Sequence, residues 1–176
     1  HGNKIISVGR LEEQKNYKSL INEMRDSNFE IEIYGEGSDK EDLIRIASEN
    51  NVKLNINKPI DNKLLLKELS KYRIFVSTSE FEGNPKAILE AMANGCVVIA
   101  KENENITEII KDNKNSILFD KNNNILNFIE NTISNKEIWT ELSHEGIKYI
   151  KNNNSLEKSV EEEYQDYQKL NQSYVS

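Results

Sequence analysis

Two glutamates stand eight positions apart in the stretch "SEFEGNPKAILEAMANGCVVIA" at residues 79–100. Glu82 precedes an apolar run, "AILEAMA", and Glu90 falls inside it. An ionised carboxylate on the buried side of a helix is costly unless a partner or hydrogen bonds compensate it. Glu90 therefore either lies on the solvent face of a helix or has a binding partner. Two vicinal ribose hydroxyls are such a partner, because a carboxylate can accept a hydrogen bond from each.

The residues between the two glutamates predict the start of a helix and an anion site. Asparagine is a good N-cap and proline suits the first helical position, so we expect Asn84 and Pro85 to open the helix. The first-turn amides and the positive end of the helix dipole attract an anion such as phosphate. Helical side chains lean toward the N-terminus, so Glu90 can reach back beside this site. The residues assigned to it are Gly83, Asn84, Pro85, Lys86, Ala87 and Ile88.

A second source of positive charge follows the first predicted strand. Arg10 and Lys15 are close enough in sequence to converge on one anion, the arginine as a fork and the lysine as a point charge. Together they could offset the charge of a diphosphate and its growth on a leaving group. Two basic residues five positions apart are also typical of an ordinary surface, and the spacing alone leaves both interpretations open.

The stretch "YGEGSD" at residues 34–39 resembles part of a glycine-rich phosphate loop. It lacks the third glycine of a dinucleotide fingerprint, so we expect no NAD site. Gly35 and Gly37 are instead predicted to form the turn into the next helix, with some of their backbone lining the site.

Short strand-like runs alternate with helical patterns along most of the chain, which predicts an α/β fold with a parallel sheet, right-handed crossovers and helices on both faces. Ligands bind beyond the carboxyl ends of such strands, so the segments after them matter most. Strands are expected at residues 4–9, 30–35, 52–56, 73–78, 97–100 and 116–119, and helices at 15–26, 39–51, 61–72, 85–94, 123–134, 136–152 and 155–171.

Composition excludes several classes of protein. A net charge of −7 argues against a nucleic-acid partner, which would need a basic stripe. Apolar runs such as "CVVIA" fall far short of the ~20 residues that span a bilayer, so we expect a cytoplasmic domain without a transmembrane segment. The single cysteine, Cys96, permits neither a disulfide nor a CxxC metal site within the chain and is expected in the core. His144 has no catalytic companion in the sequence.

Four ordered motifs, "GRLEEQKN", "IYGEGSDKEDL", "STSEFEGNPKAILEAMANGCVVIA" and "ITEII", resemble the C-terminal domain of retaining glycosyltransferases of family 4. The resemblance covers roughly residues 4–120. It implies a Rossmann-like, nucleotide-sugar-binding domain of a two-domain B-type fold, whose hallmark is a glutamate pair separated by seven residues. Glu82 and Glu90 match that pair.

The resemblance also implies a role for each site residue. Arg10 and Lys15 would hold the donor diphosphate, Glu90 the ribose, and Glu82, with the backbone of residues 83–86, would face the donor sugar. The base would lie against the loop at residues 57–59. Catalysis would rest on Glu82, Arg10 and Lys15, and nucleotide binding on these cations, residues 83–88, Glu90, Asn57 and Lys58, with no metal and no cofactor.

Three positions depart from the family pattern. Asn16 stands where a glycine commonly follows the lysine, and Ser38 replaces a frequent proline. Asn84 replaces a frequent aromatic or aliphatic residue beside the donor sugar, so it bears on which sugar is accepted.

The chain is expected to form one domain over residues 1–176, with a core at about 4–120 and a helical extension at about 121–176. The acceptor-binding N-terminal domain of the family is absent from it, so the domain should bind a UDP- or GDP-hexose but hardly catalyse. The full-length protein would transfer the hexose to a glycan or lipid, in the cytoplasm or at the membrane periphery. The alternatives are a nucleotide-sugar epimerase of the same fold and a non-catalytic interaction domain.

Overall fold

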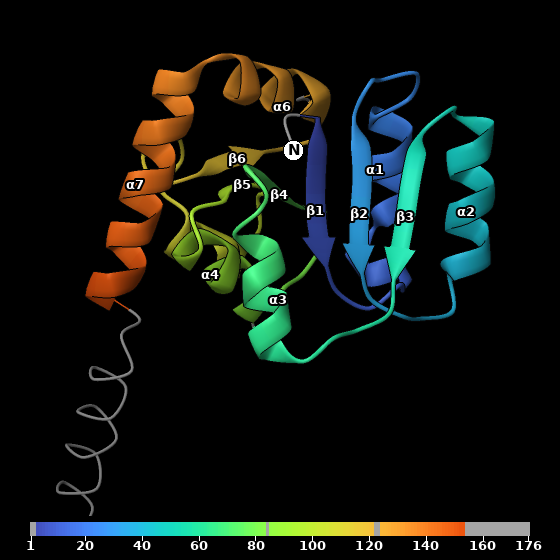
Figure 1. Cartoon of the computed structure of the whole chain (residues 1–176), viewed down its shortest axis with the longest axis horizontal. Helices are drawn as coiled ribbons and strands as arrows, with labels where there is room; N and C mark the ends of the chain where they lie inside the picture. The colour runs from blue at the N-terminus through green and yellow to red at the C-terminus, as the bar shows by residue number, and fades with distance from the viewer. Residues whose placement is uncertain (1–2, 84, 122–123, 154–176) are drawn as a thin grey trace, which may run out of the picture.

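The computed structural model describes residues 3–83, 85–121 and 124–153, which form a six-stranded parallel sheet covered by helices (Figure 1). The strand order is β3-β2-β1-β4-β5-β6, and every neighbouring pair is parallel. The strands are β1 (Lys4–Val8), β2 (Glu30–Tyr34), β3 (Lys53–Asn57), β4 (Ile74–Ser77), β5 (Val97–Lys101) and β6 (Ile117–Phe119).

Helices connect consecutive strands, as parallel pairing requires. The single-turn 3₁₀ helix η1 (Glu13–Lys15) precedes α1, and the α-helices are α1 (Tyr17–Glu23), α2 (Lys40–Glu49), α3 (Asn62–Leu69), α4 (Lys86–Ala93), α5 (Glu104–Ile109), α6 (Ile125–Ser134) and α7 (Lys136–Asn153). The predicted parallel α/β fold is confirmed, with each strand displaced by no more than about one residue from its expected bounds.

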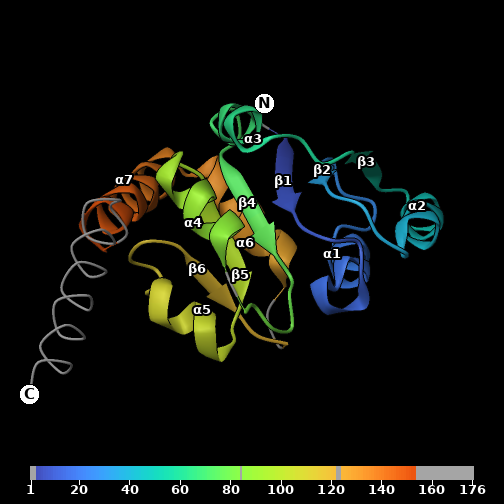
Figure 2. The same ribbon diagram turned by 90° about the horizontal axis from the view of Figure 1, so that it is seen from below.

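The two faces of the sheet bury separate apolar clusters because successive side chains of a strand point to opposite sides. Ile5 packs with α1, α2 and α6, whereas its neighbour Ile6 packs with α3 and α4. Figure 2 shows α1 and α3 on opposite sides of β1. Cys96 belongs to the second cluster, as expected, and burial raises the pKa of its thiol to about 12.

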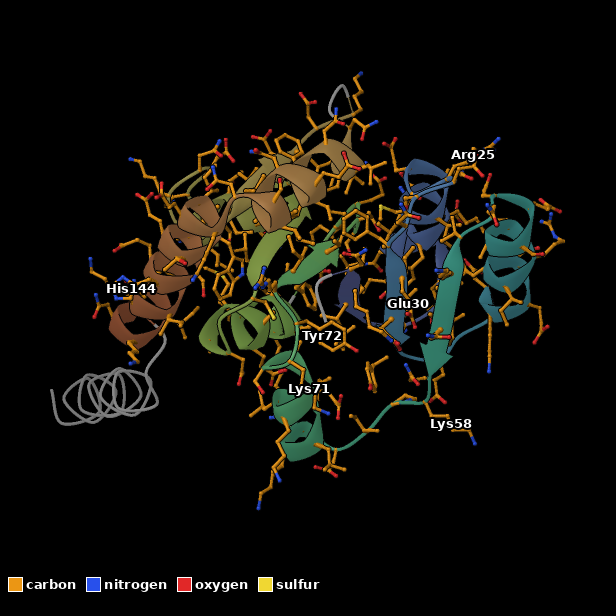
Figure 3. All side chains as sticks on the ribbon, turned by 45° about the horizontal axis from the view of Figure 1, so that its top comes forward. Arg25, Glu30, Lys58, Lys71, Tyr72 and His144 are labelled. Atoms are coloured by element: carbon orange, nitrogen blue, oxygen red, sulfur yellow. The ribbon has the colours of Figure 1, made fainter. Side chains whose placement is uncertain are left out.

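The predicted helices agree with the structure in place, with two qualifications. Pro85 has ψ 33°, which is not helical, so it occupies the N-cap position and α4 begins at Lys86, one residue later than expected. The expected helices at 123–134 and 136–152 are α6 and α7, while that at 155–171 lies outside the described residues. His144 is exposed on the outer side of α7 (Figure 3). Within the described part of the chain, no helix is long and apolar enough to cross a membrane.

Candidate functional site

A pocket of about 290 Å³ opens where β1 and β4 end, at the carboxyl edge of the sheet. Residues of the loop after β1 form one wall, and Phe81, Glu82 and Gly83 from the loop after β4 form the other. Neighbouring parallel strands end at the same edge, so these loops meet although 67 residues separate Lys15 from Glu82. The pocket brings together four of the sequence-predicted site residues: Arg10, Lys15, Glu82 and Gly83.

Lys15 and Glu82 form an ion pair across this pocket. The Lys15 Nζ donates to Glu82 Oε1 at 2.6 Å, and the two side chains are only 20% and 9% exposed. A pair so withdrawn from water is screened little by salt. The ammonium carries three N–H donors, so it can hold Glu82 and still donate to a ligand.

The backbone of Gly9 forms the floor beneath Lys15. A Cβ at this position would lie 3.0 Å from both Lys15 Cε and the Tyr17 hydroxyl oxygen, which is tighter than ordinary contact. Tyr17 is buried, and burial raises the pKa of its hydroxyl to about 12, although a hydrogen bond with Ser7 opposes this. The nearby negative charge of Glu82 also raises that pKa, so Tyr17 stays neutral under the cation.

Hydrogen bonds join the two walls of the pocket along their backbones. The Glu80 amide donates to the Gln14 carbonyl at 3.1 Å, and the Gln14 side chain donates to the Phe81 carbonyl at 2.9 Å. Thr78 Oγ1 donates to the Lys15 carbonyl at 2.8 Å, and Asn105 Nδ2 of α5 donates to the Glu82 carbonyl. These contacts join residues distant in sequence, and sequence reasoning missed them.

Arg10 is positioned by the turn after β2 and remains accessible. Its side chain is 71% exposed, with Nη1 3.2 Å from Glu12 Oε1. The turn containing Gly35 and Gly37 lies against the backbone of residues 9–11, and the Leu11 amide donates to the Glu36 carbonyl at 2.8 Å. The two glycines thus form the predicted turn into α2, and they support the Arg10 loop by close backbone contact.

The N-terminus of α4 follows the second wall of the pocket. Lys86 and Ala87 lie in its first turn, whose N–H groups have no acceptor within the helix. Ile88 differs from them, because its side chain is buried in the core and its amide donates to the Pro85 carbonyl at 2.9 Å. Asn84 lies outside the described residues.

Glu90 is tolerated in its apolar run because it lies beside the buried face of α4 rather than on it. Its side chain is 15% exposed, and Lys86 Nζ, one turn earlier, lies 3.4 Å from its carboxylate. The residues of α4 that the core buries are Ile88, Ala91 and Met92. In this structure, therefore, Lys86 compensates the charge of Glu90.

Asn57 and Lys58 lie at the end of β3, away from this pocket. Asn57 Nδ2 donates to Glu32 at 2.8 Å, and Lys58 points away from the sheet in Figure 3. Burial opposes the ionisation of Glu32, but hydrogen bonds from Asn55, Asn57 and Lys4 outweigh it and hold the pKa of Glu32 below its usual value. β3 is three strand spacings from β4, roughly 14 Å, so only an extended ligand could reach both ends.

Metal ligands do not gather at this edge. Among residues 3–83, 85–121 and 124–153, no three His, Cys, Asp or Glu side chains are grouped to hold an ion. The positive groups of the site are instead the side chains of Arg10 and Lys15 and the first turn of α4.

The strand order and the cationic pocket at the carboxyl edge define a Rossmann-like domain suited to an anionic ligand. The family described as "Glycosyl transferases group 1" matches residues 1–153. The chain belongs to this family.

Relatives of known sequence or structure are longer glycosyltransferases or their domains. The chain is 27% identical over 141 residues to the "Poly(ribitol-phosphate) alpha-N-acetylglucosaminyltransferase" of Staphylococcus aureus, covering 76% of this chain and 29% of that protein. A crystal structure of S. aureus TarM in complex with Fondaparinux, alpha-GlcNAc-glycerol and UDP is 24% identical, with a TM-score of 0.80 over 90% of this chain and 34% of TarM. The C-terminal domain of the group 1 protein LpcC from Francisella tularensis is 21% identical, with a TM-score of 0.74 over 87% of each chain. The chain thus spans less than a third of the length of the S. aureus relative.

Proposed function

We propose that this chain is the donor-binding, C-terminal domain of a retaining, metal-independent hexosyltransferase. The observation that carries the proposal is the half-buried Lys15–Glu82 pair in a pocket shared with Arg10, at the edge where an α/β sheet binds ligands. Membership of the glycosyltransferase family and the UDP bound by the structurally similar TarM support a nucleoside diphosphate as the anion.

In this proposal the two cations share the diphosphate. Arg10 presents a planar fork that can hold two phosphate oxygens, and Lys15 supplies a point charge near the sugar end of the pocket. The negative charge that grows on the departing diphosphate during transfer would be stabilised by both cations and by the first-turn amides of α4. This arrangement takes the part that a divalent ion could otherwise play.

The two glutamates divide the remaining contacts. Glu82 lines the pocket before α4, where it would accept hydrogen bonds from the donor sugar while holding Lys15. Glu90 would accept from the ribose hydroxyls, which would replace Lys86 as its partner. Asn57 and Lys58 are proposed to flank the base at the far end of an extended nucleotide.

The acceptor is proposed to bind a further domain of the full-length protein. The chain covers 34% of TarM but 87% of the LpcC domain, which supports a C-terminal placement and independent folding. Transfer needs donor and acceptor held in one geometry, so this chain alone should bind the donor and hardly catalyse.

Calorimetric titration with UDP, GDP and ADP, each with and without EDTA, tests the proposal. We expect one diphosphate to bind equally well in EDTA and its nucleoside to bind much more weakly, because Arg10 and Lys15 supply the positive charge. If EDTA abolished binding, a metal would be required and the role given to the cations would be wrong. If no diphosphate or its sugar conjugate bound, the donor-domain assignment itself would fail.

Glu90→Gln should weaken the diphosphate by roughly tenfold or more, because a hydrogen bond to a charged group contributes about 1.5 to 3 kcal/mol. The loss should be much smaller for inorganic pyrophosphate, which has no ribose. Glu68→Gln is a matched control, since Glu68 is also a helical, partly buried glutamate paired with a nearby lysine. A change in melting temperature with unchanged nucleotide affinity would assign Glu90 a structural role instead.

A further inference from the structure

Three side chains form a bridge across the ends of β1, β4 and β5, beside the proposed donor pocket. Asn16 lies between η1 and α1, Glu80 lies in the loop after β4, and Lys101 is the last residue of β5. Asn16 Nδ2 donates to Glu80 Oε1 at 2.8 Å, and Lys101 Nζ donates to the same oxygen. We call this group the Asn16–Glu80–Lys101 bridge.

The bridge attaches to the immediate neighbours of both proposed donor contacts. Asn16 follows Lys15 in the chain, and Glu80 precedes Glu82 by two residues. Lys101 belongs to a strand paired on both sides, with β4 and β6, so it is a fixed point within the sheet. Through Glu80, the bridge therefore ties each loop to a rigid element.

The backbone of Asn16 gives a reason for asparagine at this position. Its φ of 49° and ψ of 40° place it in the left-handed region, which glycine adopts freely and asparagine adopts more readily than most residues. A glycine would satisfy the backbone equally well but would bring no donor for Glu80. Asparagine thus meets the conformational requirement and adds a contact between the loops.

We propose that Asn16, Glu80 and Lys101 are positioning residues that hold Lys15 and Glu82 in the geometry the diphosphate-sugar requires. The inference rests on the proposed donor-binding function. None of the three lines the pocket next to Lys15 and Glu82, so they act through those residues. Binding is tighter when a site is ordered before the ligand arrives, because less freedom is lost on association.

The exposure of the bridge indicates that its effect falls on binding more than on folding. Glu80 is 53% exposed and Lys101 25%, and ion pairs that solvent reaches contribute little to stability. The hydrogen bond from Lys101 is the main influence that lowers the pKa of Glu80, and Asn16 adds to it, so the carboxylate is charged at neutral pH.

The test is UDP and GDP affinity in variants of the bridge, measured by calorimetry beside thermal unfolding. Asn16→Gly keeps the left-handed backbone and removes the contact, and Lys101→Met removes the charge. We expect each to weaken the diphosphate that binds the unaltered chain by about threefold to tenfold, with a melting temperature within about 2 °C. Glu80→Gln, which keeps an acceptor for Asn16, should lose less affinity than Glu80→Ala.

Lys71→Met is the matched control, because Lys71 pairs with Glu68 at 2.6 Å at a comparable exposure and lies outside the site. It should leave affinity unchanged. Variants of the bridge that bind as tightly as the unaltered chain would overturn the positioning role alone. Variants that lose affinity only in proportion to lost stability would show a structural role. An unaltered chain that binds neither UDP nor GDP would overturn this inference together with the donor-binding function on which it rests.

Discussion

Lys15→Met should nearly abolish diphosphate binding and also destabilise the fold. Binding falls because the substitution removes a charged hydrogen-bond donor from the phosphates, an expected loss of roughly 10- to 100-fold. Folding suffers because Glu82, 7% exposed, loses the cation that neutralises it. Leaving a buried charged group without its partner costs about 1 to 3 kcal/mol. Calorimetry with UDP and GDP measures the first effect, and urea unfolding measures the second.

A double-mutant cycle with Glu82→Gln separates the two effects. The double variant should regain most of the stability that Lys15→Met loses, because no unpaired carboxylate remains. It should not regain affinity, because the phosphate ligand is still missing. Glu82→Gln alone should keep diphosphate affinity within about threefold and lose the added affinity of the sugar conjugate. Recovery of diphosphate binding in the double variant would show that Lys15 serves Glu82 and not the ligand.

The sheet could be predicted because its information is local. Apolar runs such as "VVIA" of β5 are buried on both faces, and each is followed or preceded by a helical period. Parallel pairing then follows from the alternation alone. The exact start of α4 could not be predicted, because asparagine and proline are both suitable at a helix start and the choice depends on the ψ angle of Pro85.

The site was predictable in its residue types and less so in its contacts. Strand ends indicate which loops share an edge, so the approach of Lys15 to Glu82 follows from the topology. That Lys15 pairs with Glu82 before any ligand binds depends on side-chain packing and has no signature in the spacing. The Lys86–Glu90 pair is different, since it lies one helical turn apart and is readable from the sequence.

Gly35→Ala should destabilise the fold more than any other glycine-to-alanine change in the binding loops except Gly37→Ala. A Cβ on Gly35 would lie 1.9 Å from the Gly9 carbonyl oxygen and 3.0 Å from its carbon, so backbone must move. Both glycines are fixed by the sheet, since Gly9 N–H donates to Tyr34 and Gly35 N–H donates to Asn57. Overpacking of this kind costs about 1 to 3 kcal/mol, and we expect the upper end because neither neighbour is a flexible side chain. The midpoint of urea unfolding measures it.

Gly83→Ala is the control that isolates this steric cause. Its Cβ would meet only the Phe81 ring, at 3.4 Å, so the substitution should change stability by less than about 1 kcal/mol, with a gain where the unfolded chain loses freedom. Because the Gly35 turn supports the backbone on either side of Arg10, Gly35→Ala should also weaken UDP or GDP binding under conditions where the variant is still folded. Equal unfolding midpoints for the two variants would mean that the turn after β2 yields to the extra methyl group. Lowered stability with unchanged affinity would mean that Arg10 reaches the diphosphate whatever the position of that turn.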